Sequence, residues 1–219
     1  MGHGDSDVFH RLPAGQVGAS KTVLRRIESS TMAFEDRKLI LWTGKKHSGK
    51  TTHAARLVKA ARAKGYSVAG LLALAVYRDG TLTGFDAVDL RSQQRAALAR
   101  DNGNGGTTGR FEFLAEGLRL GNASLSPPAT ASADLIVVDE FGPLELNRQG
   151  WRRSVDLLVQ SSETTILLVV REELADEVER LYGNVEIVRL CVAEPESIKT
   201  VISILEGRRQ QARQHNAKT

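Results

Sequence analysis

One short segment restricts the fold of this chain more than any other feature. Residues 44–51 read GKKHSGKT and match the pattern G-x-x-x-x-G-K-[ST] at every fixed position. The apolar run KLILWT over 38–43 precedes the segment, and a helical spacing of Ala, Leu and Val over 50–64 follows it. A chance match arises in roughly one chain in a hundred of this size, but a strand before and a helix after the loop are what a functional copy needs. The segment therefore predicts an α/β fold with a phosphate-binding loop.

The residue types in this loop suit phosphate. Glycines allow successive backbone N–H groups to point into one concavity, and the start of the following helix adds partial positive charge. We expect Lys50 to reach the β- and γ-phosphates and the Thr51 hydroxyl to ligate Mg²⁺. At the variable positions we expect the backbone amides to matter more than the side chains. The nucleotide-binding residues predicted from the motif are Gly44, Lys45, Lys46, His47, Ser48, Gly49, Lys50 and Thr51.

A second candidate element is an apolar strand over 134–138 (DLIVV) that leads into Asp139 and Glu140. Ligands of open α/β sheets bind at the carboxyl edge, so a carboxylate there can hold Mg²⁺, usually through water. We assign Asp139 to the metal together with Thr51. Glu140 is predicted to orient and deprotonate the attacking water, which makes Lys50 and Glu140 the expected catalytic residues. A structural salt bridge or a helix N-cap contact is the alternative for Glu140.

Other candidate residues carry weaker signals. Arg171 follows the apolar run TILLVV over 165–170 and could reach a phosphate, although a surface ion pair with Glu172 or Glu173 explains it nearly as well. Asp86 and Asp89 are expected to be a strand-end pair rather than a metal site. An arginine finger is one further option, and its five candidates are Arg78, Arg91, Arg95, Arg100 and Arg110.

The whole pattern alternates strands and helices, which predicts right-handed crossovers and a mainly parallel sheet. A turn at RDGT between two strand-like runs predicts a hairpin. The expected strands are 38–43, 67–76, 82–88, 134–138, 165–170 and 185–192, and the expected helices are 50–64, 115–125, 151–161, 172–181 and 195–205.

The ends of the chain differ from its middle. We interpret residues 1–35 as a flexible extension, 36–205 as one domain of ordinary size, and 206–219 as a frayed basic helix end or tail. The tail has four basic residues against one acidic residue, so it supplies most of the net charge of +4. No run approaches about 18 apolar residues and the start lacks a secretory pattern. Because Cys191 is the only cysteine, no intrachain disulfide forms, and we expect a cytoplasmic protein with no membrane contact.

Four segments together resemble a known family, the P-loop nucleoside-triphosphatases of the thermophile and vertebrate cancer-related type. These are TGKKHSGKTT, GLLALAVYRDGTLTGFDAVDL, LIVVDEFGPLEL and ILLVVREEL, in that order within 39–205. The resemblance implies a three-layer, RecA-like α/β fold with a mainly parallel sheet, helices on both faces and an inserted β-hairpin. It also implies Mg²⁺-dependent hydrolysis of ATP, GTP and, by base tolerance, CTP and UTP. Thr52 would join the phosphate-binding residues, and Arg171 would fall in the V-R-E-E-L segment of the family.

The chain departs from this family at several positions. Ala73 and Ala75 stand where the family commonly has Thr and Glu, and Leu82 stands where an arginine is usual. Residues 92–94 read SQQ in place of the more usual SGE. Contacts to the nucleotide or to a partner made by the missing side chains are therefore absent, while the phosphate-binding motif is intact.

Two other classes of function fit the same motif. A small-molecule or nucleotide kinase would need an acceptor pocket and usually an arginine-rich lid. A nucleotide-switched binding module would contact RNA, DNA or protein through the basic tail. An aromatic content of 5% argues mildly against binding of single strands by base stacking. No oligomeric state is predicted.

Overall fold

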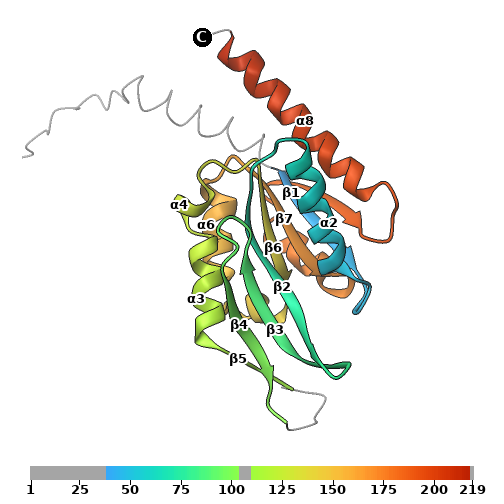
Figure 1. Cartoon of the computed structure of the whole chain (residues 1–219). Helices are drawn as coiled ribbons and strands as arrows, with labels where there is room; N and C mark the ends of the chain where they lie inside the picture. Colours follow the sequence, from blue (N-terminus) through green and yellow to red (C-terminus); the bar gives the residue numbers. More distant parts are fainter. Residues whose placement is uncertain (1–37, 104–109, 218–219) are drawn as a thin grey trace, which may run out of the picture.

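A central sheet of eight strands organises the chain, in the order β5-β4-β3-β2-β6-β7-β1-β8 (Figure 1). The computed structural model describes residues 38–103 and 110–217, so the predicted extension over 1–35 and most of the glycine-rich stretch 101–109 lie outside the described residues. The strands are β1 (Lys38–Gly44), β2 (Val68–Arg78), β3 (Thr81–Asp89), β4 (Arg95–Asp101), β5 (Phe111–Phe113), β6 (Leu135–Phe141), β7 (Thr165–Arg171) and β8 (Glu186–Cys191). The helices are α2 (Lys50–Ala63), α3 (Ala115–Ser124), α4 (Pro127–Thr130), α5 (Pro143–Leu146), α6 (Arg152–Ser161), the 3₁₀ turn η1 (Glu172–Leu174), α7 (Ala175–Leu181) and α8 (Ser197–Asn216).

Five neighbouring strands, β2, β6, β7, β1 and β8, run parallel. β7 separates β1, which leads into the phosphate loop, from β6, which carries Asp139 and Glu140. The inner strands are apolar on both faces because both faces are covered. All parallel strands end at one edge, which brings the loop, the two acidic residues and Arg171 to the same side of the sheet.

Helices cover both faces of the sheet and create two apolar cores. Ile40 and Trp42 of β1 pack with residues of α2 and α8 on one face. Leu39 and Leu41 pack with residues of α6 and α7 on the other. This alternation is the two-residue period of a strand buried on both sides, and it confirms the three-layer α/β architecture. Trp42 and Trp151 are both buried packing residues.

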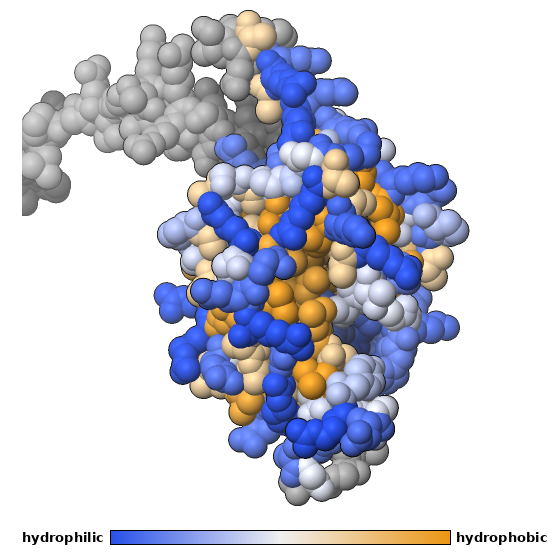
Figure 2. Space-filling view, in the orientation of Figure 1, coloured by the Kyte–Doolittle hydropathy of each residue, from blue (hydrophilic) through white to orange (hydrophobic). Residues whose placement is uncertain are grey.

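The predicted hairpin forms from β2 and β3, and β4 and β5 extend it into an antiparallel half-sheet. β2 pairs with β6 only as far as Leu71. The rest of the hairpin therefore projects from the edge that carries the phosphate loop (Figure 1). An apolar strip lies over β2 on the face shown in Figure 2. Leu74 and Val76 of this strand are half-buried.

Three elements differ most clearly in extent from the sequence prediction, and smaller shifts of one or two residues occur at the ends of β2 and β3. β6 does not stop before Asp139 and Glu140 but continues to Phe141. The helix expected over 172–181 is divided into η1 and α7. The helix expected over 195–205 begins at Ser197 and continues to Asn216, so most of the basic segment is helical. No helix in the described ranges combines the length and the apolar character that a membrane crossing needs.

Contacts along the basic end of α8 explain why it continues beyond the apolar core. The guanidinium of Arg209 lies 4.2 Å from the centroid of the Tyr66 ring and donates to the Gly65 carbonyl at 3.0 Å. Arg208 donates to the Glu163 carbonyl. These arginines therefore bind the body of the protein, at the edge of the sheet opposite the phosphate loop.

Asp86 and Asp89 are buried residues of β3 that have structural partners. Asp86 accepts hydrogen bonds from Arg95 and Arg100, each at 2.5 Å. Asp89 accepts from the backbone N–H groups of Arg91 and Ser92 and from the Ser124 hydroxyl. Neither aspartate belongs to a group of three or more metal-ligating side chains within the described residues.

Asp86 yields a prediction about stability and pH. Burial alone would raise the pKa of Asp86, but the hydrogen bonds from Arg100 and Arg95 outweigh it and the pKa is lowered. The ionised Asp86 therefore stabilises the fold in full above its pKa in the unfolded chain, about 3.9. This stabilisation is lost as the pH falls through the lower pKa that Asp86 has in the folded protein. Asp86→Asn is expected to reduce the free energy of unfolding at pH 7 by about 1 kcal/mol, because the two ion pairs are lost. The reduction is no larger because both arginines are partly exposed to solvent. Urea unfolding from pH 7 to 3 should show this difference shrinking below about pH 4, whereas Asp79→Asn at the exposed turn should change little.

Candidate active site

The phosphate loop joins the end of β1 to the start of α2. Its backbone takes the left-handed conformation at His47 (φ 64°) and Gly49 (φ 78°), and the Ser48 N–H donates to the Lys45 carbonyl at 3.1 Å. A Cβ atom at Gly44 would lie 2.5 Å from the Ser48 Oγ, so any larger residue at the first loop position would force the Ser48 side chain to move. Gly49 is the N-cap of α2 and provides no side-chain cap. The first N–H groups of the helix are therefore available to an anion.

The Lys50 side chain is buried within this loop, with a residue exposure of 8%. Its Nζ donates to the Lys45 carbonyl at 3.1 Å. The Ser48 Oγ is also buried and has no hydrogen-bond partner among the described residues. A buried ammonium and an unpaired hydroxyl in one loop form a cradle for an anionic group. Lys45, Lys46, His47 and Thr52 have exposed side chains, so the contribution expected of the first three rests on their backbone.

Asp139 lies behind the loop and is almost fully buried, at 1% exposure. Its Oδ2 accepts from the Ala73 N–H at 3.2 Å, and its carboxylate is hydrogen-bonded to the Thr51 side chain. Burial raises the pKa of Asp139 to about 7, and the charge of Glu140 adds to the increase, while the Thr51, Ala73 and Lys50 contacts oppose it. A hydroxyl and a carboxylate side by side are oxygen ligands of the kind that Mg²⁺ prefers. The residues present thus fit a magnesium ion whose charge would compensate the buried acid.

Glu140 and Arg171 form an ion pair across neighbouring strands. The Arg171 Nε donates to Glu140 Oε1 at 3.0 Å, and each side chain is about one-third exposed, 32% for arginine and 33% for glutamate. Among the alternatives from the sequence, the salt bridge of Glu140 is present, but the partner of Arg171 is neither Glu172 nor Glu173. The pairing depends on β6 and β7 being neighbours, which sequence spacing does not reveal.

Glu145 has a role that the sequence reading did not assign. It is 4% exposed, accepts from the Gly142 N–H at 3.0 Å and from the Trp151 N–H at 3.3 Å, and so ties together the loop that follows Glu140. Burial raises the pKa of Glu145, although both backbone bonds oppose the increase. The only signal in the sequence was the distinctive phrase DEFGPLEL, in which Glu145 is the second glutamate.

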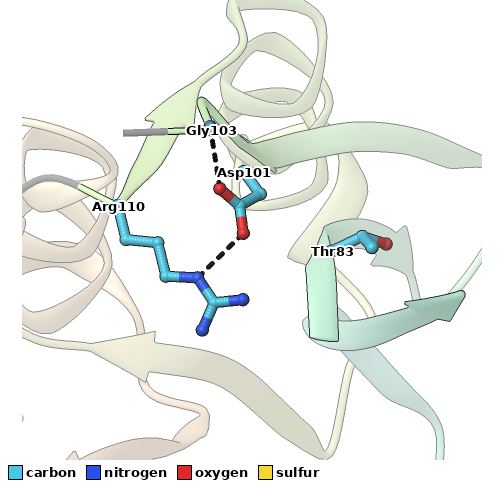
Figure 3. Close-up of a pocket in the computed structure, with 4 residues that line it drawn as sticks. All are labelled: Thr83, Asp101, Gly103 and Arg110. Atoms are coloured by element: carbon cyan, nitrogen blue, oxygen red, sulfur yellow. Dashed lines mark hydrogen bonds and ion pairs between the residues drawn. The ribbon is translucent and has the colours of Figure 1, made fainter. Parts of the chain in front are cut away.

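The candidate arginine fingers mostly have structural contacts. Arg91 donates to the carbonyls of Pro128 and Ala129, and Arg95 and Arg100 hold Asp86. Arg78 lies exposed at the end of β2. Figure 3 shows Arg110 bound to Asp101 in a hollow that Thr83 and Gly103 also line. No residue of the phosphate loop lines this hollow, so it is separate from the candidate active site.

Comparison with known proteins places this chain in a family. A family model described as NTPase matches residues 39–203. The nucleoside-triphosphatase THEP1 of Methanothermobacter thermautotrophicus is 35% identical over 162 residues, which are 72% of this chain and 87% of that protein. The matched region contains the phosphate loop, Asp139, Glu140 and Arg171.

Solved structures support the same fold. The crystal structure of THEP1 from Aquifex aeolicus has a TM-score of 0.58 and 20% identity, covering 78% of this chain and 99% of that one. The solution structure of a human cancer-related nucleoside triphosphatase also has a TM-score of 0.58, with 21% identity and coverage of 80% and 98%. Since the family match spans the strands and the loop that build the site, the chain belongs to the nucleoside-triphosphatase family and is an enzyme of that class.

Proposed function

We propose that this protein hydrolyses nucleoside triphosphates, ATP and GTP among them, to the diphosphate and phosphate with Mg²⁺. The observation that carries the proposal is the convergence at one sheet edge of a buried Lys50 in the phosphate loop, the Thr51–Asp139 pair, and Glu140. The names of the relatives, which describe nucleoside-triphosphatases, support the same reaction. The single cysteine suits a reducing compartment, so we propose that the reaction takes place in the cytoplasm.

Each residue has a distinct task in this mechanism. The loop N–H groups and the N-terminus of α2 bind the phosphate oxygens, and Lys50 neutralises charge on the β- and γ-phosphates. Thr51 and Asp139 would hold Mg²⁺, which when bound would neutralise negative charge on the phosphates. Because Asp139 is buried and already held by the Ala73 N–H and Thr51, its carboxylate is preorganised for that task.

Glu140 is the proposed base that activates water. Its carboxylate is one-third exposed, so water can reach it, and it adjoins Asp139 in the chain at the edge where the γ-phosphate would lie. A carboxylate in this position can orient a water molecule and accept its proton as the γ-phosphoryl group is transferred. Water then takes the place of an acceptor substrate, which distinguishes a hydrolase from a kinase.

The two alternative functions have less support from the structure. Arg91 donates to a carbonyl of α4, and Arg95, Arg100 and Arg110 bind aspartates of β3 and β4, so these four residues do not form the lid of arginines that a kinase would use. Arg208 and Arg209 of the basic segment bind the protein itself. Binding of nucleic acid through this segment would compete with those contacts.

The proposal is tested by phosphate release without any acceptor. The wild-type protein is expected to release phosphate from ATP, GTP, CTP and UTP with Mg²⁺, and to stop when EDTA removes the metal. Release only after an acceptor is added would favour a kinase, and no release from any of the four nucleotides would overturn the proposal.

Replacement of Asp139 tests the metal assignment. Asp139→Asn is expected to weaken the apparent affinity for Mg²⁺ by about 10- to 100-fold, because the neutral amide keeps the shape but loses the charge that holds the ion. A titration of phosphate release against Mg²⁺ at saturating ATP measures this shift. Asp79→Asn is the matched control, since Asp79 has φ 49° and asparagine tolerates that conformation. An unchanged Mg²⁺ dependence in Asp139→Asn would remove Asp139 from the metal site.

A further inference from the structure

Arg171 lies at the end of an interior strand of the sheet, whereas residues of surface ion pairs usually lie on its exterior. It is the last residue of β7, the strand between the one that leads into the phosphate loop and the one that carries Glu140. In the register of β1 and β7, Arg171 lies directly opposite Gly44, the first residue of the loop. Arg171 is therefore central among the elements that form the site.

The alternation of side chains along β7 places Arg171 on the face of the sheet that α2 covers. Val169 of β7 packs in the core that contains Trp42 and the residues of α2, whereas Val170 packs in the opposite core. Because side chains alternate along a strand, Arg171 shares the face of Val169. Val137 of β6 packs in the same core as Val169, so Asp139, two residues further along β6, also lies on this face. Arg171, Asp139 and the N-terminus of α2 thus lie on one face at one edge.

The hydrogen bond to Glu140 uses only part of the guanidinium. Nε is the donor to Glu140 Oε1, and the two terminal amino groups carry further N–H donors in the same plane. With both side chains about one-third exposed, the pair contributes little to stability. A planar group that binds a carboxylate with one edge can bind a phosphate with another.

We propose that Arg171 is a positioning residue that senses the γ-phosphate of a bound triphosphate and holds Glu140 toward the attacking water. With a triphosphate bound, the terminal amino groups of Arg171 bind a γ-phosphate oxygen while Nε keeps the Glu140 carboxylate oriented. With a diphosphate, the guanidinium contacts Glu140 alone. The inference rests on the proposed hydrolysis, and it adds that this arginine distinguishes triphosphate from diphosphate.

The test compares Arg171→Gln and Arg171→Lys with Arg153→Gln, an exposed arginine on α6, as the control. Arg171→Gln is expected to lower kcat by about 100-fold through misplacement of Glu140, with a melting temperature like that of the wild type. Its affinity for a non-hydrolysable ATP analogue should fall about tenfold, the effect of one charge-assisted contact, while its affinity for ADP stays unchanged. Arg171→Lys should recover part of the discrimination, since it keeps the charge but not the planar fork.

Binding measurements separate this inference from the proposed function. In a Glu140→Gln background, Arg171→Gln should not lower kcat further, yet it should still reduce affinity for the ATP analogue relative to ADP. Equal losses of affinity for both nucleotides, or an unchanged kcat in Arg171→Gln, would overturn the inference. If the wild type released no phosphate, the proposed function would fail, but the ratio of the two affinities would still decide whether Arg171 senses the γ-phosphate.

Discussion

Glu140→Gln is expected to lower kcat for phosphate release by about 10²- to 10⁴-fold, the usual contribution of a general base. The amide keeps the size of the side chain and can still accept a hydrogen bond from Arg171, but it does not take a proton from water. Affinity for Mg²⁺–ATP should persist, because the loop, Lys50 and Asp139 are unchanged. Steady-state phosphate release gives kcat, and titration with a fluorescent ATP analogue gives the affinity.

The control for this variant is Glu177→Gln, an exposed glutamate on α7, which packs on the face of the sheet opposite α2. It makes the same chemical change and should leave kcat and affinity at wild-type values. Loss of nucleotide affinity together with kcat in Glu140→Gln would mean that Glu140 supports binding rather than water activation. Activity within a few-fold of the wild type would assign the base to another residue.

Lys50→Ala is expected to reduce both affinity for ATP and the rate of hydrolysis. Lys50 is the buried cation of the loop, and its Nζ donates to the Lys45 carbonyl at 3.1 Å. We expect phosphate oxygens to replace this carbonyl as the acceptor when ATP binds. Its positive charge would act on the γ-phosphate in both the ground state and the transition state. A fall in kcat of roughly 10²- to 10³-fold, as for the loss of one preorganised donor, should accompany a higher KM.

Lys59→Ala is the control for the effect of Lys50, since Lys59 is an exposed lysine on the same helix. Both variants should give the same circular dichroism spectrum as the wild type. A loss of activity in Lys50→Ala with an altered spectrum would indicate misfolding of α2. A normal spectrum with normal kcat and KM would contradict the role of Lys50 at the phosphates.

The local parts of the site could be predicted from the sequence. Strand β1, the loop and α2 are continuous in the chain, and the glycines report directly on the backbone that the loop needs. The prediction of a helix over 50–64 agrees with α2 to within one residue. The apolar run before Asp139 identified β6 because a strand buried on both faces reads as an uninterrupted apolar segment.

Elements stabilised by distant partners were harder to predict. β4 reads RAALARD and begins and ends with charged residues, so its pattern is not that of a buried strand. It pairs with β3, where Arg95 and Arg100 bind Asp86, and it buries Leu98 and Ala99 against the rest of the protein. Glu145 was missed for a similar reason, since it is held by backbone N–H groups of a turn and of a position six residues later.

By itself, the sequence determined that this protein has a phosphate-binding loop between a buried strand and a helix, together with an acidic pair after a second buried strand. Such features are set by contiguous residues, whose backbone preferences and hydrophobic periods act locally. Only the tertiary structure decided that β7 lies between these two strands, and hence that Arg171 reaches Glu140. Strand order depends on how the helices cover the two faces of the sheet, and that packing joins residues too far apart in the chain for any local pattern to report.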